Sequence, residues 1–539
     1  MFRSIFFLVL LVFTGQTYAQ EDAWVYLTDK PNVSEALANP SSILTQKAIA
    51  RKQRHGIPID ARDVPVNEAY ISQLKSQTGI TVLAKSKWFN SVYVRGISLE
   101  NIKDLSELPF VDAIDFADTS LNTSTSRTRQ VLSKTSVEDT RVDFTYGDSQ
   151  NQVEMINVDA LHTAGYTGKG ITIAVLDSGF PNVNTMQAFQ RLRDQGNLLG
   201  GYDFVDRTED IYANTTSSHG TLVLSSMAAY IENEYVGTAP DASYYIFNTE
   251  DPDSESPAEE SYWVEATERA DSLGVDMINT SLGYNLFDNA KYNYTTADMN
   301  GKVAFISKGA SIAVEKGILV VVSAGNSGAT SWRTVTAPAD SPDILSIGAV
   351  NAFGEYVSFS SQGGEAQVGY QKPDVVARGG ATFLVNENDQ IVQYNGTSFS
   401  SPIMCGGIAS LWQSIPEVSA TMVMNLVRES GSQYSNPDDF LGYGIPDLAL
   451  AKDFALSIND DVMEAIRFYP NPVSTVLNLV LPSSLETLEY AIYNQLGQQV
   501  SQHAMQGNSK TIDVSGLSHG VYILKLSSRS NSKSFKFIK

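Results

Sequence analysis

The middle of the chain alternates between two hydrophobic patterns. Residues 171–176 and 317–323 are short continuous apolar runs rich in Val and Ile, which are typical of strands buried in a parallel sheet. Segments with helical spacing of apolar residues lie between such runs. The expected elements are strands at 171–176, 244–247, 275–279 and 317–323, and helices at 219–229, 262–272 and 303–315. This alternation predicts an α/β domain whose parallel sheet is covered by helices on both faces.

Residues 20–120 have a different pattern and are expected to form a small α+β unit. Its strands are predicted at 24–27, 91–97 and 110–114, and its helices at 42–54 and 102–108. The helix at 42–54 has a basic face and is expected at the surface together with His55. Residues 121–150 are rich in Ser, Thr, Arg and Asp without apolar periodicity, which is the composition of a linker.

Short strand-like segments separated by turns fill the end of the chain. They lie at 476–480, 490–493, 511–514, 521–526 and 534–538, and they predict a small β-sandwich. The expected division of the chain is therefore a leader at 1–19, an α+β unit at 20–120, a linker at 121–150, the central domain at 151–460 and the β-sandwich at 465–539.

Length and charge narrow the class of protein. A chain of 539 residues has room for two to four domains, and its net charge of −23 argues against nucleic-acid binding. Arg3, the apolar run 5–13 and the small residue Ala19 predict a signal peptide over residues 1–19. No later apolar run is long enough to span a membrane, so we expect an exported chain without a transmembrane segment.

The single cysteine, Cys405, excludes an intramolecular disulfide. It lies in an apolar helical pattern and is expected to be a packing residue rather than a nucleophile.

Residues 394–410 are the first candidate for chemistry. Asn395 and Gly396 predict a turn, and the small apolar residues after Pro402 predict a buried helix. Ser398 then lies at the start of a helix, where unpaired N–H groups favour a developing negative charge, as a serine nucleophile requires. Read alone, the same pattern fits a turn followed by a core helix with a serine cap.

A base and an acid can be sought upstream of Ser398. Asp177 ends the strand at 171–176, and sites are built at the carboxyl ends of parallel strands. His219 opens the helix at 219–229. Read alone, Asp177 is a turn former or a metal ligand, and His219 is a helix cap. The other four histidines lie in the terminal units or at a polar helix end near the surface: His55, His162, His503 and His519.

Four segments resemble the motifs of subtilisin-like serine proteases, the subtilases. They are Val-Leu-Asp-Ser-Gly around Asp177, His-Gly-Thr at His219, Ser-Ala-Gly-Asn ending at Asn326, and Gly-Thr-Ser-Phe-Ser-Ser-Pro around Ser398. Their order along the chain is the subtilisin order. The resemblance implies that Ser398 attacks the peptide carbonyl, that His219 transfers the proton, and that Asp177 orients the imidazole.

The same resemblance implies a binding role for neighbouring segments. Asn326 would donate its side-chain amide to the oxyanion, together with the backbone N–H of Ser398. Ser281, Leu282 and Gly283 would pair with an extended substrate and border the first specificity pocket, and Ala324 and Gly325 would also bind the substrate. Read alone, these residues are the end of a buried strand and an Asn-Ser-Gly turn.

The acidic segment 249–260 leaves three interpretations open. A solvated loop is favoured, and a substrate subsite or a calcium site are the alternatives, because clustered carboxylates suit hard cations. The spacing matches no ligand loop, so we assign no metal-binding residue. The chemistry needs no cofactor, and a structural calcium ion stays an open alternative.

The terminal units carry further expectations. Subtilisin-like proteases commonly begin with a propeptide that assists folding and blocks the cleft, so residues 20–120 are expected to inhibit their own peptidase. The motifs Tyr-Pro-Asn-Pro at 469–472, Tyr-Asn-Gln-Leu-Gly at 493–497 and Leu-Ser-His-Gly-Val-Tyr at 517–522 resemble the C-terminal sorting domain of the type IX secretion system of Bacteroidetes. The resemblance implies recognition by that secretion machinery.

The sequence therefore predicts a secreted serine endopeptidase that acts on proteins or peptides. A catalytically silent scaffold for binding at the cell surface is the alternative, although such a protein would normally lack one of the four motif residues. A serine hydrolase with a nucleophile elbow is disfavoured, because no Gly-x-Ser-x-Gly surrounds Ser398. Whether the mature protein is released or attached to the cell surface stays open.

Overall fold

The computed structural model describes residues 20–122, 144–364, 371–464, 466–480, 487–506, 511–527 and 532–539. The predicted signal peptide and most of the predicted linker at 121–150 lie outside these residues. Within them, no helix is long and apolar enough to cross a membrane.

A parallel sheet of seven strands forms the centre of the molecule, in the order β13-β12-β11-β10-β5-β9-β6. The predicted α/β fold class is confirmed, and the strands expected at 171–176, 244–247, 275–279 and 317–323 are β5, β9, β10 and β11. The seven strands are β5 (Thr172–Asp177), β6 (Leu198–Asp203), β9 (Ser243–Asn248), β10 (Met277–Thr280), β11 (Leu319–Ser323), β12 (Leu345–Val350) and β13 (Val375–Arg378).

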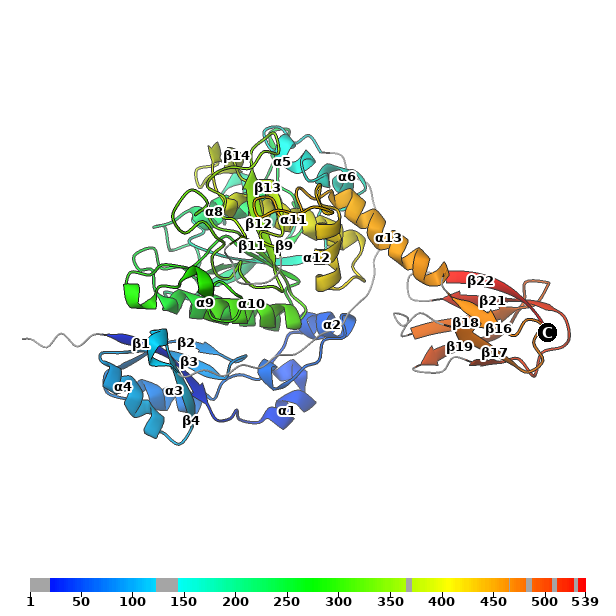
Figure 1. Ribbon diagram of the computed structural model, residues 1–539, viewed down its shortest axis with the longest axis horizontal. Helices are drawn as coiled ribbons and strands as arrows, with labels where there is room; N and C mark the ends of the chain where they lie inside the picture. Colours follow the sequence, from blue (N-terminus) through cyan, green and yellow to red (C-terminus); the bar gives the residue numbers. More distant parts are fainter. Residues whose placement is uncertain are drawn as a thin grey trace, which may run out of the picture.

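Long helices cover the sheet. Helices α8 (His219–Ala228) and α11 (Thr397–Ser414) pack against each other and against the strands, whereas α9 (Pro257–Leu273) and α10 (Phe305–Glu315) form a second pair. Figure 1 shows α9 and α10 between the sheet and the N-terminal unit. The remaining helices and hairpins of the domain are α5 (Gln150–Glu154), α6 (Val158–Thr163), α7 (Gln190–Asp194), β7 (Tyr230–Ile231), β8 (Tyr235–Val236), β14 (Thr382–Val385), β15 (Ile391–Tyr394) and α12 (Ala420–Glu429).

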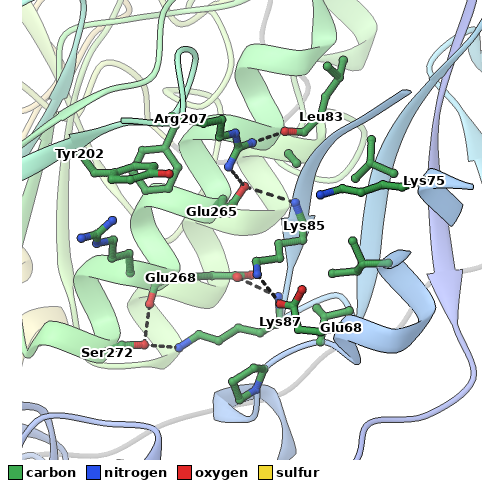
Figure 2. A pocket seen from close by; sticks show the side chains of 17 residues that line it. Glu68, Lys75, Leu83, Lys85, Lys87, Tyr202, Arg207, Glu265, Glu268 and Ser272 are labelled. Carbon is green, nitrogen blue, oxygen red and sulfur yellow. Dashed lines mark hydrogen bonds and ion pairs between the residues drawn. The ribbon is translucent and has the colours of Figure 1, made fainter. Parts of the chain in front are cut away.

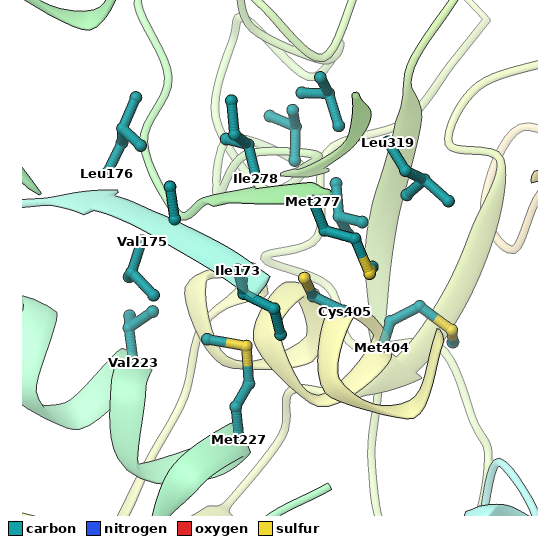
Figure 3. Close-up of a cluster of buried hydrophobic side chains, with 14 of the residues drawn as sticks. Ile173, Val175, Leu176, Val223, Met227, Met277, Ile278, Leu319, Met404 and Cys405 are labelled. Atoms are coloured by element: carbon teal, nitrogen blue, oxygen red, sulfur yellow. The ribbon is translucent and has the colours of Figure 1, made fainter. Parts of the chain in front are cut away.

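The core lies between the sheet and the pair α8–α11. Figure 3 shows Met227 of α8 and Met404 and Cys405 of α11 against the strand residues Ile173 and Met277. All five side chains are fully buried. The expectation that Cys405 is a packing residue is confirmed, and burial raises the pKa of its thiol, which keeps it from acting as a thiolate.

The N-terminal unit is an antiparallel sheet in the order β2-β3-β1-β4, backed by short helices. Figure 2 shows residues of α9 directed toward this unit, among them Glu265, Glu268 and Ser272. The elements of the unit are β1 (Glu21–Leu27), α1 (Val33–Ala38), α2 (Gln46–Arg54), α3 (Glu68–Lys75), β2 (Ile80–Ser86), β3 (Ser91–Gly96), α4 (Leu99–Lys103) and β4 (Val111–Phe116).

One surface prediction for this half of the chain is correct only in part, and another is wrong. Helix α2 exposes one face, with Lys47 and Arg54, but Arg51 and Lys52 are buried in ion pairs, and His55 stacks on Trp412 with ring centroids 5.7 Å apart. His162 is fully buried as well, between the hydroxyl of Tyr146 and the carbonyl of Thr238. Arg51, Lys52 and His162 are buried here because each finds a partner that the local sequence does not reveal, whereas Nδ1 of His55 is buried without a hydrogen-bond partner among the described residues.

Helix α13 (Leu448–Glu464) leads from the central domain to the C-terminal unit. This unit consists of two small antiparallel sheets, β16-β17-β20 and β19-β18-β21-β22, which enclose their own core around Leu477, Ile492, Leu524 and Phe537. Its strands are β16 (Arg467–Tyr469), β17 (Val476–Val480), β18 (Thr487–Tyr493), β19 (Gln499–Gln506), β20 (Thr511–Asp513), β21 (Val521–Ser527) and β22 (Ser532–Ile538).

Candidate active site

The end of β5 brings the predicted acid to the predicted base. Asp177 is the last residue of the strand and is fully buried, and its Oδ1 lies 2.6 Å from Nδ1 of His219, the first residue of α8. The turn after the strand needs a glycine, because Gly179 has a φ of 71° and a Cβ there would lie 2.1 Å from the carbonyl oxygen of Ser217. The Asp-Ser-Gly sequence therefore allows the close approach that joins Asp177 to His219.

His219 is placed to exchange a proton on its outer side. Asp177 occupies Nδ1, and the imidazole side chain keeps 32% of its surface exposed. Burial lowers the pKa of His219, but the charge of Asp177 and its hydrogen bond outweigh this effect and raise the pKa above the ordinary value of 6.5. Nε2 has no hydrogen-bond partner among the described residues, so this nitrogen is available for a nucleophile or a leaving group.

Ser398 is the second residue of α11 and is 8% exposed. Its Oγ donates a hydrogen bond to the carbonyl oxygen of Ser281 at 3.3 Å, and the structure has no hydrogen bond between this Oγ and His219 within its described residues. The next residue, Phe399, contacts the imidazole of His219 with ring centroids 5.8 Å apart. The start of α11 thus adjoins His219.

Asn326 is fixed to the residue that precedes Ser398. Its Oδ1 accepts hydrogen bonds from the backbone N–H of Thr397 at 2.9 Å and from the Thr397 hydroxyl at 3.0 Å. Because two donors occupy the oxygen, the side-chain N–H groups are the free part of the amide. Gly325, with a φ of 105°, also donates its N–H to Thr397 at 3.2 Å. The loop after β11 therefore presents amide donors beside the start of α11.

The segment that follows β10 runs beside Ser398 and consists of Ser281, Leu282 and Gly283. The Ser281 hydroxyl donates to the carbonyl of Ser398 at 2.7 Å, which reciprocates the bond from Ser398 to Ser281. The backbone groups of Leu282 and Gly283 have no hydrogen-bond partner in the described part of the chain. A peptide could pair with this free segment in the manner of an added strand.

The two predicted walls of the specificity pocket behave differently. Ala324 is fully buried and donates its N–H to Ile347 at 2.9 Å, so it is part of the sheet. Gly325 and Gly283 lie on either side of Thr336: a Cβ would lie 3.1 Å from its hydroxyl at Gly325 and 2.1 Å from it at Gly283. A side chain at Gly283 would force Thr336 to shift, so the glycine allows Thr336 to pack closely against the backbone of this segment.

A cavity of about 520 Å³ opens beside His219. Ser281 and Leu282 form part of its wall, and most of the remainder is acidic. None of these carboxylates forms an ion pair within the described residues. The acidic lining residues are Glu250, Asp251, Asp253, Glu255, Glu259 and Asp288.

Burial and mutual repulsion perturb these carboxylates. Burial is the main cause that raises the pKa values of Glu250 and Glu259 above their usual range, and the charges of neighbouring carboxylates act in the same direction. Burial and the charge of Asp288 raise the pKa of Glu255 to about 6. Such groups favour a positively charged partner, which would stabilise their ionised forms.

The favoured interpretation of segment 249–260 as a solvated loop is correct only in part. Residues 249–256 form a loop in which Asp253 and Glu255 are exposed, whereas the last four residues begin α9, and Glu259 and Glu260 are buried there. Glu259 caps the helix through the backbone N–H of Ser256 at 2.8 Å. The described residues contain no cluster of three or more His, Cys, Asp or Glu side chains with a geometry that could hold a metal ion.

Two features of the site are not predicted by the sequence motifs. Thr397 belongs to the motif around Ser398, and in the structure it is the residue that anchors Asn326 and Gly325. Asp288 completes the acidic wall from a loop that no motif marks. A signal for Thr397 exists, because a threonine directly before the serine can bond an amide across the cleft. Asp288 has no local signal.

Comparisons with known proteins identify the family of the central domain. The family described as "Subtilase family" matches residues 168–444, and the chain therefore belongs to the subtilases, which makes it a serine-type endopeptidase. The description "Peptidase S8 propeptide domain, Bacteroidota" matches residues 22–134, and "Secretion system C-terminal sorting domain" matches residues 467–539. The N-terminal unit is thus a propeptide, and the C-terminal unit indicates export.

Several curated relatives are subtilisins. Subtilisin E of Bacillus subtilis (strain 168) is 32% identical over 302 residues, which cover 56% of this chain and 69% of that protein. Subtilisin of Bacillus pumilus is also 32% identical over 302 residues, and the match covers 95% of its length. Among solved structures, the MycP3 protease from the type VII (ESX-3) secretion system matches 60% of this chain and 93% of its own at 20% identity, with a TM-score of 0.46.

Proposed function

We propose that this chain is an exported endopeptidase in which Asp177, His219 and Ser398 form the catalytic triad. The observation that carries the proposal is the 2.6 Å contact of Asp177 with Nδ1 of His219, which leaves Nε2 open on the side where α11 begins with Ser398. An imidazole held in this tautomer is a general base for a serine hydroxyl.

Bond cleavage follows from these positions. Ser398 Oγ leaves its hydrogen bond with Ser281, gives its proton to Nε2 of His219 and attacks the carbonyl carbon of the substrate. The resulting oxyanion accepts hydrogen bonds from the Asn326 amide and the Ser398 N–H. His219 then passes the proton to the departing amine, and the C–N bond breaks to leave an ester on Ser398.

The second half of the reaction hydrolyses the ester and regenerates the free enzyme. Water gives one proton to Nε2 of His219 and attacks the ester carbonyl, and the same proton goes back to Ser398 Oγ as the ester bond breaks. The carboxylate of Asp177 stabilises the transient imidazolium in both halves. Every step uses side chains of this protein, so the chemistry needs no cofactor; a structural calcium ion stays an unassigned prediction.

The substrate is an extended segment of a protein or peptide. Supporting this, Leu282 and Gly283 offer unpaired backbone groups next to Ser398, and Gly325 is bonded to Thr397, the residue before Ser398. The acidic cavity beside His219 adds a preference, because six carboxylates without an ion-pair partner among the described residues favour a basic side chain close to the cleaved bond.

Export and maturation complete the proposal. The leader at 1–19 directs the chain out of the cytoplasm, and the C-terminal unit presents it to the type IX secretion machinery, to be released or attached at the cell surface. Cleavage within 121–150 separates the propeptide, which inhibits the peptidase until it dissociates. The alternative of a silent binding scaffold is not favoured, because Asp177, His219, Asn326 and Ser398 are all present.

The test compares purified wild-type protein with Ser398→Ala on a mixed peptide library. Wild type should cleave the library and give a sequence preference around the scissile bond, whereas the variant should show no cleavage above background. Equal cleavage by both proteins would remove Ser398 as the nucleophile.

A further inference from the structure

The propeptide contains a segment that its sheet does not need. Residues 33–63 lie between β1 and α3 and include α1 and α2, and they add no strand to the sheet. Instead, α2 contacts α9, and the surrounding residues reach the ends of α9 and α10. We propose that these two helix ends form a second docking site for the propeptide, which retains the cleaved propeptide on the peptidase through buried ion pairs.

The backbones approach most closely at two glycines. Gly274 ends α9 with a φ of 82°, and a Cβ there would lie 2.5 Å from the backbone nitrogen of Ala48 in α2. Gly317 follows α10 with a φ of 83°, and a Cβ there would lie 2.9 Å from Ile57. In addition, Thr45 donates its N–H to the carbonyl of Ser272 at 3.0 Å. Both helix ends are therefore shaped to receive this segment.

The propeptide and the peptidase each contribute acidic and basic side chains to the contact. Asp271 of α9 accepts an ion pair from Lys52 of the propeptide at 2.9 Å and a second one from Arg51. In the opposite direction, Lys316 after α10 pairs with Asp63 of the propeptide at 2.7 Å and with Asp60 at 3.0 Å. Each part thus supplies both an acid and a base.

These ion pairs are enclosed. The side chains of Lys52, Asp63 and Asp271 are 0% exposed, and those of Arg51 and Lys316 are 2% and 1% exposed. Burial lowers the pKa of Lys52, whereas the charges of Lys52 and Arg51 outweigh burial at Asp271 and hold its pKa below the usual range. Removal of Lys52 would leave Asp271 with Arg51 as its remaining ion-pair partner among the described residues and would also break the 3.1 Å pair of Lys52 with Asp63, which is more costly than the loss of an exposed pair.

This docking site adjoins the contact made by the propeptide sheet. There, Glu268 accepts hydrogen bonds from the backbone N–H groups of Lys87 at 2.8 Å and Trp88 at 2.9 Å. Figure 2 shows Glu268 beside Lys87. Asp271 lies about one helical turn further along α9, so the docking site extends the same interface toward α10. Truncated propeptides that keep only the sheet would lose this extension.

The test is Lys52→Met in the full-length chain, and it rests on the proposed function because release is followed through peptidase activity. The mature peptidase has the same sequence in this variant as in the wild type, so its kcat and thermal unfolding should be unchanged. After self-processing, we expect the propeptide to dissociate roughly 10²-fold faster, since buried pairs act mainly on the dissociation rate. Co-elution of propeptide with peptidase and the delay before activity both measure this rate.

A matched control is Lys85→Met in the same propeptide. Lys85 pairs with Glu68, and their side chains are 44% and 66% exposed, so its loss should change the release rate by less than about twofold. Equal release in Lys52→Met and wild type, or equal acceleration in both variants, would overturn the docking proposal. Absence of activity in wild type itself would instead contradict the proposed function.

A second measurement covers a variant that fails to mature. In Ser398→Ala the chain stays intact, so hydrogen exchange can compare this protein with and without Lys52→Met. We expect faster exchange of the α2 amides and unchanged protection of β1 and β3 in the double variant. Unchanged α2 protection would overturn the proposal, and so would equal loss of protection in α2 and the two strands.

Discussion

Two charged regions at opposite ends of α9 differ in how their charges are balanced. At the first turn of the helix, Glu259 belongs to a cavity with six carboxylates and no ion pair among the described residues. At the last turn, Asp271 is paired with Arg51 and Lys52 of the propeptide. Glu259 and Asp271 are both buried, so these two residues differ in their partners rather than in their exposure, whereas Asp253, Glu255 and Asp288 of the cavity are exposed.

The paired charges around Asp271 form a fixed contact between propeptide and peptidase, whereas the acidic cavity has the properties of a binding site. Charges that find their partners within the chain cost little to bury and hold two parts of the structure in one arrangement. Carboxylates without a charged partner have raised pKa values, and a bound cation would stabilise their ionised forms. The acidic cavity adjoins His219, so we expect the cation that binds there to be a basic side chain of the substrate.

The largest effect on catalysis should come from His219→Ala, because this substitution removes the general base beside the acidic cavity. We expect kcat to fall by about 10⁶-fold, the size known for serine proteases whose triad loses its base. Steady-state kinetics on a peptide substrate gives the value. Thermal unfolding should match that of the wild type, and a loss below about 10²-fold with intact folding would remove His219 from proton transfer.

Asp177→Asn should reduce kcat by about 10⁴-fold. The amide keeps the shape of the side chain but favours the wrong tautomer of His219 and gives no charge to stabilise the imidazolium. Kinetics at saturating substrate measures the loss, with Asp241→Asn as a control for an aspartate paired with Arg191 away from the cleft. Similar losses in both variants would show that the effect is structural.

Asn326→Ala should lower kcat by roughly 10²–10³-fold with little change in KM, because the amide acts on the oxyanion rather than on the bound substrate. The hydrogen bonds from Thr397 to Asn326 are lost as well, so the melting temperature must be measured in parallel. Unchanged turnover would contradict the assignment of Asn326.

The acidic cavity can be tested with substrates that differ in one charge. Glu250→Gln combined with Glu255→Gln should reduce the preference for an arginine over a glutamate substrate by about tenfold in kcat/KM, as expected for loss of nearby charges. The control is Glu429→Gln on the exposed side of α12, which should leave the preference unchanged. An unaltered preference in the double variant would assign these carboxylates to structure alone.

The smallest effect concerns pH. Peptidase activity should rise with pH as His219 loses its proton, with a midpoint above 6.5 because Asp177 raises the pKa of the imidazole. In Asp177→Asn the residual activity should have a lower midpoint, since burial alone lowers the pKa. The pH profile of kcat/KM in both proteins gives this shift, and a higher midpoint in the variant would contradict it.

The segments around Asp177, His219 and Ser398 could be predicted because each is recognised from its own local sequence pattern. The apolar run before Asp177 and the small-residue helix after Ser398 each specify an element, and the order of motifs supplies the rest. The relation between the elements also follows from general rules, since the carboxyl ends of parallel strands meet at one edge.

The two charged regions could not be predicted in the same way. Lys52 and Asp271 are 219 residues apart in the chain, and a basic helix without visible partners is expected at the surface. The acidic cavity draws Asp288 and the residues of segment 250–259 together only after α9 and the loop past β10 are placed. Burial of charge depends on partners from distant segments, and local patterns do not contain that information.

The most direct test of the central claim is covalent labelling with a fluorophosphonate probe, followed by peptide mapping. The wild-type protein should carry one adduct, on the peptide that contains Ser398, and labelling should be absent in Ser398→Ala and at least about 10³-fold slower in His219→Ala. An adduct on another serine, such as Ser281 or Ser400, or equal labelling of Ser398→Ala, would contradict the account.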